Sequence, residues 1–268
     1  HPTMARRPGA DNAFRMLGVN LKTHQHAWDA DMTGDVLGAP VAAAGMVYFT
    51  CTDGRVFCLK SNTGGSDWHV VAHASSAPVV AEQVLAVTTE EKTFRGTWVG
   101  IRRYTIADGE LKDEKPLAPT LVSAAAASVH GGWDYQGPKL AYANNCLFNA
   151  PGNTINAVAL DSGKDRWRAV VTGDGLGRQA NSLTPPALGK EKLYLGSAKG
   201  HILALKQTDG SLAYSYKLSE PLASQPILAE GNLYFGTASG LLVCLKLNDK
   251  DAEGWYAWGG DAQHNKVK

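Results

Sequence analysis

Short runs of apolar and β-branched residues, separated by glycine and polar turns, recur along the whole chain. At 40–60, a proline and small residues precede a turn, an aromatic run, an Asp-Gly turn and a second apolar run. Runs of about four to eight such residues between turn signals are typical of β-strands. Apolar residues at helical spacing are nearly absent, and only 121–129 could be interpreted as a helix. The pattern therefore predicts an all-β chain.

The same pattern returns almost without gaps at 186–206 and 226–246, and more weakly at 75–117 and 141–167. Positions that coincide in the clearest copies are Tyr48, Tyr194 and Tyr234, then Gly54, Gly200 and Gly240, then Leu59, Leu205 and Leu245. An aromatic residue closes each of these copies: Trp68, Tyr214, and Trp255 or Trp258. A single four-stranded sheet of this length cannot bury both of its faces. We therefore predict four-stranded antiparallel blades stacked around an axis, which is a β-propeller.

The repeats predict five near-complete blades and one partial blade in a single domain covering 1–268. The expected boundaries are 1–38 for the partial blade, then 39–74, 75–119, 120–175, 176–220 and 221–265. Two alternatives remain open at this point. Residues 1–38 could complete a six-bladed ring by strand exchange with the C-terminal residues. Otherwise the chain is the C-terminal part of a ring of seven or eight blades.

The charge balance argues against nucleic acid as a partner. Lys and Arg number 26 and Asp and Glu 25, so the formal net charge is +1. A near-neutral chain has no overall attraction to a phosphate backbone. Arg102 and Arg103 are expected to form one exposed basic doublet and not a nucleic-acid patch. No apolar run reaches the roughly 20 residues that span a bilayer, and no signal peptide is visible.

The pattern Val47-Tyr48, then Asp53-Gly54, then Leu59 and a later Trp resembles the quinoprotein-type (PQQ-like, WD40-like) propeller repeat. The segment 160–167, Leu-Asp-Ser-Gly-Lys-Asp-Arg-Trp, is similar to the signature of that family. The resemblance extends from about Phe14 to Asn265. Proteins with this repeat include quinoprotein alcohol dehydrogenases and the propeller lipoprotein of the bacterial outer-membrane assembly machine. The resemblance implies a propeller fold and a bacterial, periplasmic or extracellular location.

The resemblance also allows a test for the PQQ cofactor. In the dehydrogenases it lies on the axis of an eight-bladed ring, between a Trp and a disulfide of two adjacent Cys, beside bound calcium. The four Cys here are residues 51, 58, 146 and 244, and no two are adjacent. We therefore expect no PQQ, no metal and no catalytic residue. Cys51 aligns with Ser197, and Cys58 with Ala204 and Cys244, so these thiols are expected to be small, buried core residues without a disulfide.

Two segments depart from the repeat and carry reactive side chains. Residues 128–138 form a glycine-rich insertion that contains His130, Trp133, Asp134 and Tyr135. Residues 174–182 precede an inner strand and contain Arg178, Gln179 and Asn181. Loops on a rigid scaffold often carry function, so we expect these seven residues to bind a ligand or partner at the axial mouth. The alternative is a packed connection whose Trp covers a blade edge.

Asn144, Asn145 and Asn149 are interpreted as turn residues. The function predicted from the sequence is a non-catalytic platform for a protein partner or ligand, within a larger exported protein or assembly. One alternative is a fragment or subunit of a quinoprotein or cytochrome-linked oxidoreductase. Another is a hydrolase or lyase that uses His130, Tyr135 and Arg178. The oligomeric state is left open.

Overall fold

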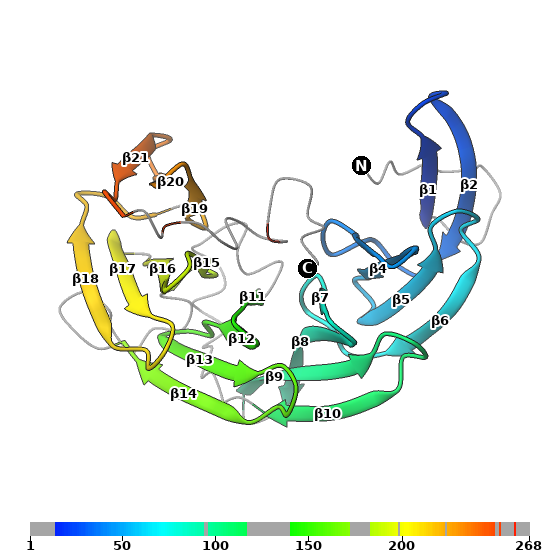
Figure 1. Cartoon of the computed structure of the whole chain (residues 1–268), viewed down its shortest axis with the longest axis horizontal. Helices are drawn as coiled ribbons and strands as arrows, with labels where there is room; N and C mark the ends of the chain where they lie inside the picture. Colours follow the sequence, from blue (N-terminus) through cyan, green and yellow to red (C-terminus); the bar gives the residue numbers. More distant parts are fainter. Residues whose placement is uncertain are drawn as a thin grey trace.

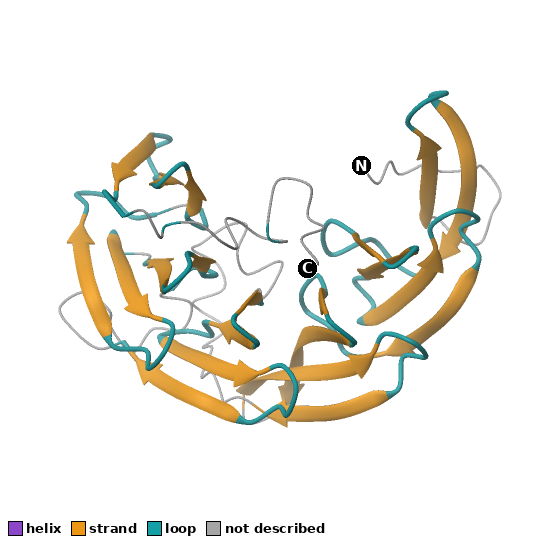
Figure 2. Cartoon of the chain, viewed as in Figure 1, coloured by secondary structure: helices purple, strands orange, loops and turns teal. Residues whose placement is uncertain are grey.

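The computed structural model describes residues 14–93, 96–116, 140–171, 183–197, 199–222 and 224–249, together with 252 and 260. Every regular element in these residues is a β-strand, and they contain no helix (Figure 2). Accordingly, none of them forms a helix long and apolar enough to cross a bilayer. Residues 121–129, for which the sequence allowed a helix, lie outside the described residues. The all-β prediction is confirmed.

The chain begins with a two-stranded hairpin and continues as four four-stranded sheets and one three-stranded sheet. The hairpin consists of β1 (Phe14–Asn20) and β2 (Gln25–Met32). The first full sheet contains β3 (Val41–Ala43), β4 (Met46–Thr50), β5 (Arg55–Lys60) and β6 (Ser66–Val71). The second contains β7 (Val79–Ala81), β8 (Val84–Thr93), β9 (Gly96–Thr105) and β10 (Leu111–Pro116). The third contains β11 (Ala141–Ala143), β12 (Cys146–Asn149), β13 (Thr154–Ala159) and β14 (Asp165–Val170).

The fourth full sheet contains β15 (Ala187–Leu188), β16 (Lys192–Gly196), β17 (His201–Lys206) and β18 (Leu212–Lys217). The last contains β19 (Ile227–Ala229), β20 (Asn232–Gly236) and β21 (Leu242–Lys246). The sheets follow one another in chain order along an arc, with β7, β11 and β15 toward the centre and β6, β10, β14 and β18 on the rim (Figure 1). The arrangement confirms propeller blades, five of them near-complete and one partial.

The core lies between successive sheets, because alternate residues of each strand point to opposite faces. Tyr48 in β4 is 1% exposed and belongs to a buried cluster with Val80, Leu85 and Tyr104 of the following sheet. Its neighbour Phe49 points the other way and packs in a cluster with Met16 and Met32 of the preceding hairpin. Each inner sheet is therefore covered on both faces by its neighbours.

An irregularity of register recurs where the outermost strand of a sheet begins. The register shifts directly after Gly18, Cys58, Ala157 and Ala204, each of which is paired with an aromatic residue of the outermost strand. These partners are Trp28, Trp68, Trp167 and Tyr214. A bulge of this kind bends a strand and redirects a side chain. Here it places a large ring opposite a small residue at the same position of four sheets.

The strand ends divide the ring into two faces. At one of them the innermost strand begins, the second strand turns into the third, and the outermost strand ends, as the pairs Val41↔Tyr48 and Arg55↔Val71 show. We call this the insertion face. The connections that begin and end at it are 33–40, 51–54, 72–78, 94–95, 117–140, 150–153, 171–186, 197–200, 218–226 and 237–241.

Candidate functional site

The seven residues that the sequence singles out all lie outside the described residues: His130, Trp133, Asp134, Tyr135, Arg178, Gln179 and Asn181. Their role in binding therefore stays a prediction. The described strands nevertheless fix where the chain leaves and re-enters the fold around them. Segment 117–139 runs from β10 to β11, and segment 172–182 from β14 toward β15, so all four ends lie at the insertion face.

A third departure from the repeat ends at the same face. Strands β8 and β9 are ten residues long, whereas β4 has five and β5 six. Their pairing continues without interruption to Thr93↔Gly96. The long hairpin and the insertion at 117–139 belong to neighbouring sheets, and the segment at 172–182 leaves the second of them. These three departures from the repeat therefore begin and end at the insertion face, over adjoining sheets.

Tryptophan side chains join most of these sheets. The indole Nε1 of Trp68 donates a hydrogen bond to the carbonyl oxygen of Ile106 at 3.1 Å, in the turn before the last strand of the next sheet. The ring lies against Gly109 of that turn, where a Cβ atom would be 2.6 Å from a ring carbon. Gly109 has φ +72°, a conformation that glycine adopts without strain. A small residue with positive φ is therefore required beneath the indole.

The same arrangement recurs at two other sheets. Trp28 Nε1 donates to the carbonyl of Ser61 at 2.9 Å and lies against Gly64, and Trp167 Nε1 donates to the carbonyl of Gln207 at 2.7 Å and lies against Gly210. Each contact combines burial of an aromatic ring with satisfaction of its N–H group. The bulge in the outermost strand thus has a consequence beyond its own sheet, because it aims the indole at the neighbouring turn.

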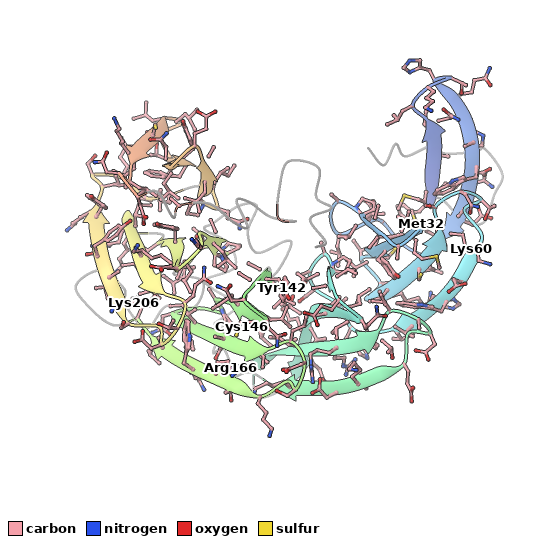
Figure 3. The ribbon with its side chains drawn as sticks, in the orientation of Figure 1. Met32, Lys60, Tyr142, Cys146, Arg166 and Lys206 are labelled. Atoms are coloured by element: carbon pink, nitrogen blue, oxygen red, sulfur yellow. The ribbon has the colours of Figure 1, made fainter. Side chains whose placement is uncertain are left out.

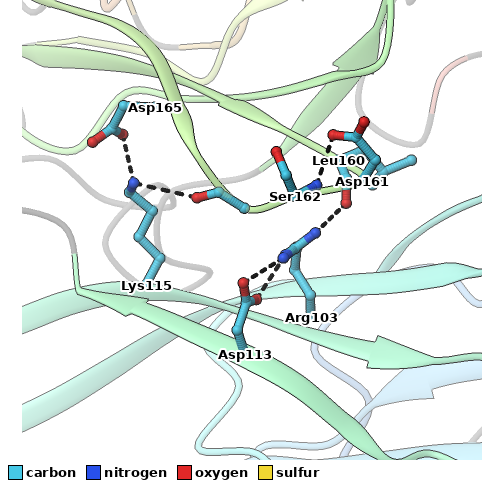
Figure 4. Close-up of polar contacts among 8 residues, drawn as sticks. Arg103, Asp113, Lys115, Leu160, Asp161, Ser162 and Asp165 are labelled. Carbon is cyan, nitrogen blue, oxygen red and sulfur yellow. Dashed lines mark hydrogen bonds and ion pairs between the residues drawn. The ribbon is translucent and has the colours of Figure 1, made fainter.

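The sheet β7–β10 has no tryptophan at this position, and an ion pair takes its place (Figure 4). Asp113 lies where three other sheets have Trp, and its partner across the strand pair is Arg103, where those sheets have a small residue. Arg103 Nε donates to Asp113 Oδ1 at 2.7 Å, and Arg103 Nη2 pairs with Asp113 Oδ2. Arg103 Nη1 donates to the carbonyl of Leu160, the position equivalent to Ile106. The guanidinium therefore replaces the indole N–H.

We call the contact between the β7–β10 and β11–β14 sheets the polar interface. Besides Arg103, it contains Lys115, whose Nζ lies 2.9 Å from Asp165 Oδ1 and 3.3 Å from the carbonyl oxygen of Gly163 (Figure 4). Arg103 is only 4% exposed. Arg102 is 18% exposed by side chain and bonds to Glu114 and the carbonyl of Ala72. The expectation of an exposed basic doublet at 102–103 was wrong, because the two side chains reach the two neighbouring sheets.

Two buried asparagines lie at the insertion-face end of the same interface. Asn149 is 0% and Asn156 3% exposed, and they pair across β12 and β13 directly beneath the turn at 150–153. Equivalent pairs in other sheets are Phe49↔Phe57 and Leu195↔Leu203. Phe49 and Phe57 pack toward the preceding sheet, so Asn149 and Asn156 are turned toward β7–β10. Asn149 was therefore wrongly interpreted as a turn residue, whereas Asn144 and Asn145 do occupy a turn, each with positive φ.

The amides of these asparagines lack partners. Among the described residues, no hydrogen-bond partner exists for Nδ2 and Oδ1 of Asn149 or for Nδ2 of Asn156. An unsatisfied buried polar group costs about 1–3 kcal/mol. Donors and acceptors side by side match a water molecule or a peptide group. Sequence analysis missed this feature, although the alignment of Asn149 with Phe49 and Leu195 could have revealed it.

At the interface between β15–β18 and β19–β21, a tyrosine occupies the position that tryptophan has in other sheets. Tyr214 lies opposite Ala204, and Asp249 accepts hydrogen bonds from Lys192 Nζ at 2.8 Å and from the Tyr194 hydroxyl at 3.2 Å. Burial raises the pKa of the Tyr194 hydroxyl. The hydrogen bond that Lys192 donates to Asp249 raises the pKa of Lys192. Lys192 therefore stays charged and Tyr194 neutral at physiological pH, which suits a structural contact.

The cysteines are free thiols, as expected. Burial raises the pKa of Cys51 to about 12 and that of Cys58 to about 11, so neither is a thiolate at neutral pH. Cys146 lies near Arg166 of the same sheet (Figure 3), and burial raises its pKa although the guanidinium opposes the rise. Cys244 differs from its aligned partner Cys58: it is exposed, so the expectation of a buried core position was wrong for it. Within the described residues, no set of three or more His, Cys, Asp or Glu side chains is placed to hold a metal ion.

Comparison with known proteins identifies the family. The sequence matches the family described as outer membrane protein assembly factor BamB over residues 15–131 and 137–264. The chain belongs to this family. The BamB family match, together with the structural likenesses below, confirms the resemblance to the PQQ-like propeller repeat. A search among curated protein sequences finds no match.

Solved structures share the fold at low identity. The computationally designed Ika8 protein is 15% identical with a TM-score of 0.61, over 84% of this chain and 63% of that chain. BamB from Moraxella catarrhalis is 12% identical with a TM-score of 0.50, over 86% and 78%. Quinohemoprotein alcohol dehydrogenase from Comamonas testosteroni is 15% identical with a TM-score of 0.57, over 87% and 43%. The chain thus spans less than two thirds of the designed protein and less than half of the dehydrogenase.

Among the described residues, the cysteines do not form the PQQ site that the resemblance implies, and absence of the cofactor stays an expectation. That site needs a disulfide between adjacent cysteines, and the four cysteines here are separate, free and on different strands or turns. Cys58 is enclosed between sheets beside Tyr48 and Trp68.

Proposed function

We propose that the chain is a non-catalytic propeller platform that binds a protein partner through its insertion face, within a larger exported assembly. The observation that carries the proposal is that three large departures from the repeat begin and end on one face of adjoining sheets. The opposite ends of these sheets keep short turns, such as those at 61–65 and 207–211. A rigid ring with long connections on one side is the usual arrangement of a binding scaffold.

The family description supports a particular kind of partner. It names an assembly factor of outer membrane proteins, so the proposed partner is a protein component of that assembly, and the proposed location is periplasmic. The predicted contact residues at the axial mouth are Trp133, Tyr135 and Arg178, together with the other four of the set.

The test is site-specific photocrosslinking in the cell that makes the protein. A photoreactive amino acid replaces Trp133 or Arg178. In control variants it replaces Lys60 or Lys206, which are exposed and end β5 and β17 at the opposite face (both are labelled in Figure 3). The expected result is one shared crosslinked protein from positions 133 and 178 and none from 60 and 206. Equal crosslinking from both faces, or none from the insertion face, would overturn the proposal. A dehydrogenase activity that depends on added PQQ would favour the oxidoreductase alternative instead.

A further inference from the structure

The outer edge of β18 is less protected than the outer edges of the other full sheets. β18 is the outermost strand of its sheet, on the rim of the arc (Figure 1), and no strand of the described residues pairs with its far side. Natural proteins use charged side chains and proline to keep a free strand edge from pairing with another chain. The outermost strands β6, β10 and β14 each contain at least two charged or histidine side chains. β18 contains one, Lys217, at its last position.

The main chain of β18 bonds to β17 at every second residue. The N–H of Leu218, directly after the strand, donates to the carbonyl of Gly200 at 2.7 Å. In an antiparallel pair, residues that exchange such bonds alternate with residues that do not. The register is regular over this stretch, so Tyr216 bonds to β17. The N–H and carbonyl groups of Ser215 and Lys217 therefore point away from the sheet.

A small side chain leaves these outward groups accessible. Ser215 is exposed and pairs across the sheet with Leu203. The residues at its position in the other full sheets are all larger, and two of them carry a charge: His69, Glu114 and Arg168. A large or charged side chain beside the edge hinders the addition of a further strand, whereas serine does not. Among the four outermost strands, β18 is therefore the one best suited to pair.

The two sides of β18 differ in chemistry. The ring of Tyr216 is exposed, and its centroid lies 5.7 Å from that of Tyr214, on the side that meets the following sheet. Successive side chains of a strand point to opposite faces, so Ser215 and Lys217 lie on the other side. A strand added at this edge would meet aromatic rings on one side, and a hydroxyl group and a cation on the other.

We propose that the edge of β18 binds an extended segment of another protein, in which apolar residues alternate with polar and acidic ones. The segment adds an antiparallel strand to the sheet, and its main chain pairs with the outward groups of Ser215 and Lys217. Its apolar side chains pack beside Tyr214 and Tyr216, and its carboxylates lie near Lys217. The edge lies on the rim, so this inference does not rest on the partner proposed for the insertion face.

A second copy of the chain fits this edge less well. β18 contains one cation and no carboxylate, so two copies of the strand bring together only positive charges. Electrostatic complementarity favours a partner strand of opposite charge. An acidic segment of another protein provides it.

The first test uses a fluorescent ten-residue peptide that alternates valine with glutamate or threonine. It is titrated with the 268-residue chain and followed by fluorescence anisotropy. In the proposed pairing, the N–H groups of glutamate and threonine face Ser215 and Lys217, and those of valine face outward. Methylation of the glutamate and threonine nitrogens should therefore weaken binding about 10-fold, because main-chain hydrogen bonds are lost. Methylation of the valine nitrogens is the matched control and should leave the affinity unchanged.

Variants of the protein locate the site. Ser215→Pro removes an outward N–H without removing a bond to β17. Ser215→Glu keeps the main chain intact, and introduces the side chain that β10 has at this position. Each variant should weaken binding of the peptide about 10-fold. Arg168→Pro, at the same position of β14, is the control and should bind as the parent chain does. Bound peptide should also slow hydrogen exchange of the Ser215 and Lys217 amides in NMR spectra.

Three results would overturn the proposal. Absence of binding, or equal weakening by both patterns of methylation, means that the peptide does not pair with this edge. Unchanged affinity of Ser215→Glu, or equal weakening by Ser215→Pro and Arg168→Pro, places the peptide elsewhere. A dimer that Ser215→Glu abolishes in sedimentation experiments identifies a second copy as the occupant.

Discussion

The indole of each docked tryptophan combines two contributions that other side chains at the position cannot combine. It buries an aromatic ring against a glycine of the next sheet, and its N–H satisfies a carbonyl that would otherwise be shielded from water. Trp68 shows both, with its ring 6.0 Å from Tyr48 and its hydrogen bond to Ile106. The contact is therefore expected to matter to stability far more than the partial exposure of the ring suggests.

Replacement of this ring should be costly. Trp68→Ala is expected to lower the free energy of unfolding by about 2–4 kcal/mol, because truncation of a buried aromatic residue costs about 3–5 kcal/mol and this ring is partly exposed. Urea denaturation followed by circular dichroism measures the change. Val71→Ala, at a side chain 58% exposed on the same strand, is the control and should stay within about 0.5 kcal/mol. Equal effects of the two variants would show that the docking contact is dispensable.

A substitution of Asn149, whose amide lacks hydrogen-bond partners, should instead raise stability. Asn149→Leu introduces the residue found at the equivalent Leu195 and removes an unpaired amide, so the melting temperature should rise by an amount corresponding to about 1 kcal/mol. The reciprocal variant Leu195→Asn places an amide among apolar neighbours and should cost about 2–4 kcal/mol. Calorimetry of both variants provides the test. A loss of stability in Asn149→Leu would mean that a bound water or peptide group satisfies the amide.

At this scale the sequence predicted small core residues well and polar exceptions poorly. Cys58 and Ala204 align and are both buried, as expected from their size. Arg103 and Asn149 were misplaced because polarity alone suggested a surface or a turn. Their positions in the repeat would have placed them inside the ring, since the residues aligned with them are small or apolar. A charge inside a repeat protein is therefore better located by alignment of the repeats than by its polarity.

At the scale of strands and sheets, the polar interface is the element that differs most from its neighbours. In its Arg103–Asp113 pair the guanidinium is only 4% exposed and the carboxylate 35%, so removal of Asp113 leaves a buried charge without its partner. Three other sheets have a small residue and a tryptophan at these two positions, and the β15–β18 sheet has a small residue and a tyrosine. The two solutions are alternatives at one position, which makes them exchangeable in principle.

A double substitution tests this equivalence. Asp113→Ala alone should lower the free energy of unfolding by about 3–5 kcal/mol. Arg103→Ala combined with Asp113→Trp recreates the arrangement of the other sheets and should recover most of the loss. Arg55→Ala removes an exposed ion pair with Asp53 and serves as the control, with an expected effect of about 0–1 kcal/mol. The measurement is chemical denaturation of the four proteins. Failure of the double variant to recover would mean that the sheet β7–β10 is oriented differently from the others.

The pattern of turns and apolar runs was sufficient to predict the sheets, including a long hairpin within 75–117, but not the bulges. The turn glycines at 54, 200 and 240 all adopt positive φ, which is why the alignment found them. The bulge leaves no signal of its own in a single sequence, because any small residue can precede it. It becomes visible only through the tryptophan that it redirects.

At the scale of the whole molecule, stability should decrease from the middle of the arc to its ends. Sheets β7–β10 and β11–β14 have a neighbour on each side, whereas the β1–β2 hairpin and the β19–β21 sheet have an exposed face. Amide hydrogen exchange of the 268-residue chain should therefore be fastest in the two end elements and slowest in β8, β12 and β13. Mass spectrometry of peptic fragments measures this. Uniform protection from β1 to β21 would contradict it.

A binding role for residues at 130–135 and 178–181 could be predicted from the sequence because they interrupt a repeat, and an interruption is visible without a structure. What they bind was not predictable, since a propeller is compatible with many partners. The described strands add that both segments start and finish on one face beside the polar interface. That restricts the search for a partner to one side of the ring.

The glycine beneath each tryptophan has a consequence for how such a ring can be rebuilt. The ring of Trp167 packs against Gly210, so the residues that form one contact between sheets come from two consecutive sheets. If a single sheet were transplanted into another propeller, its tryptophan would pack against a turn of that propeller. Its own turn would in the same way meet a side chain of that propeller. The unit that can be moved intact is offset from the sheet: it begins before one tryptophan and ends after the glycine on which that tryptophan rests. Exchange of repeats between proteins of this kind should therefore succeed when the boundaries lie inside the sheets. It should fail when the boundaries lie in the connections between sheets.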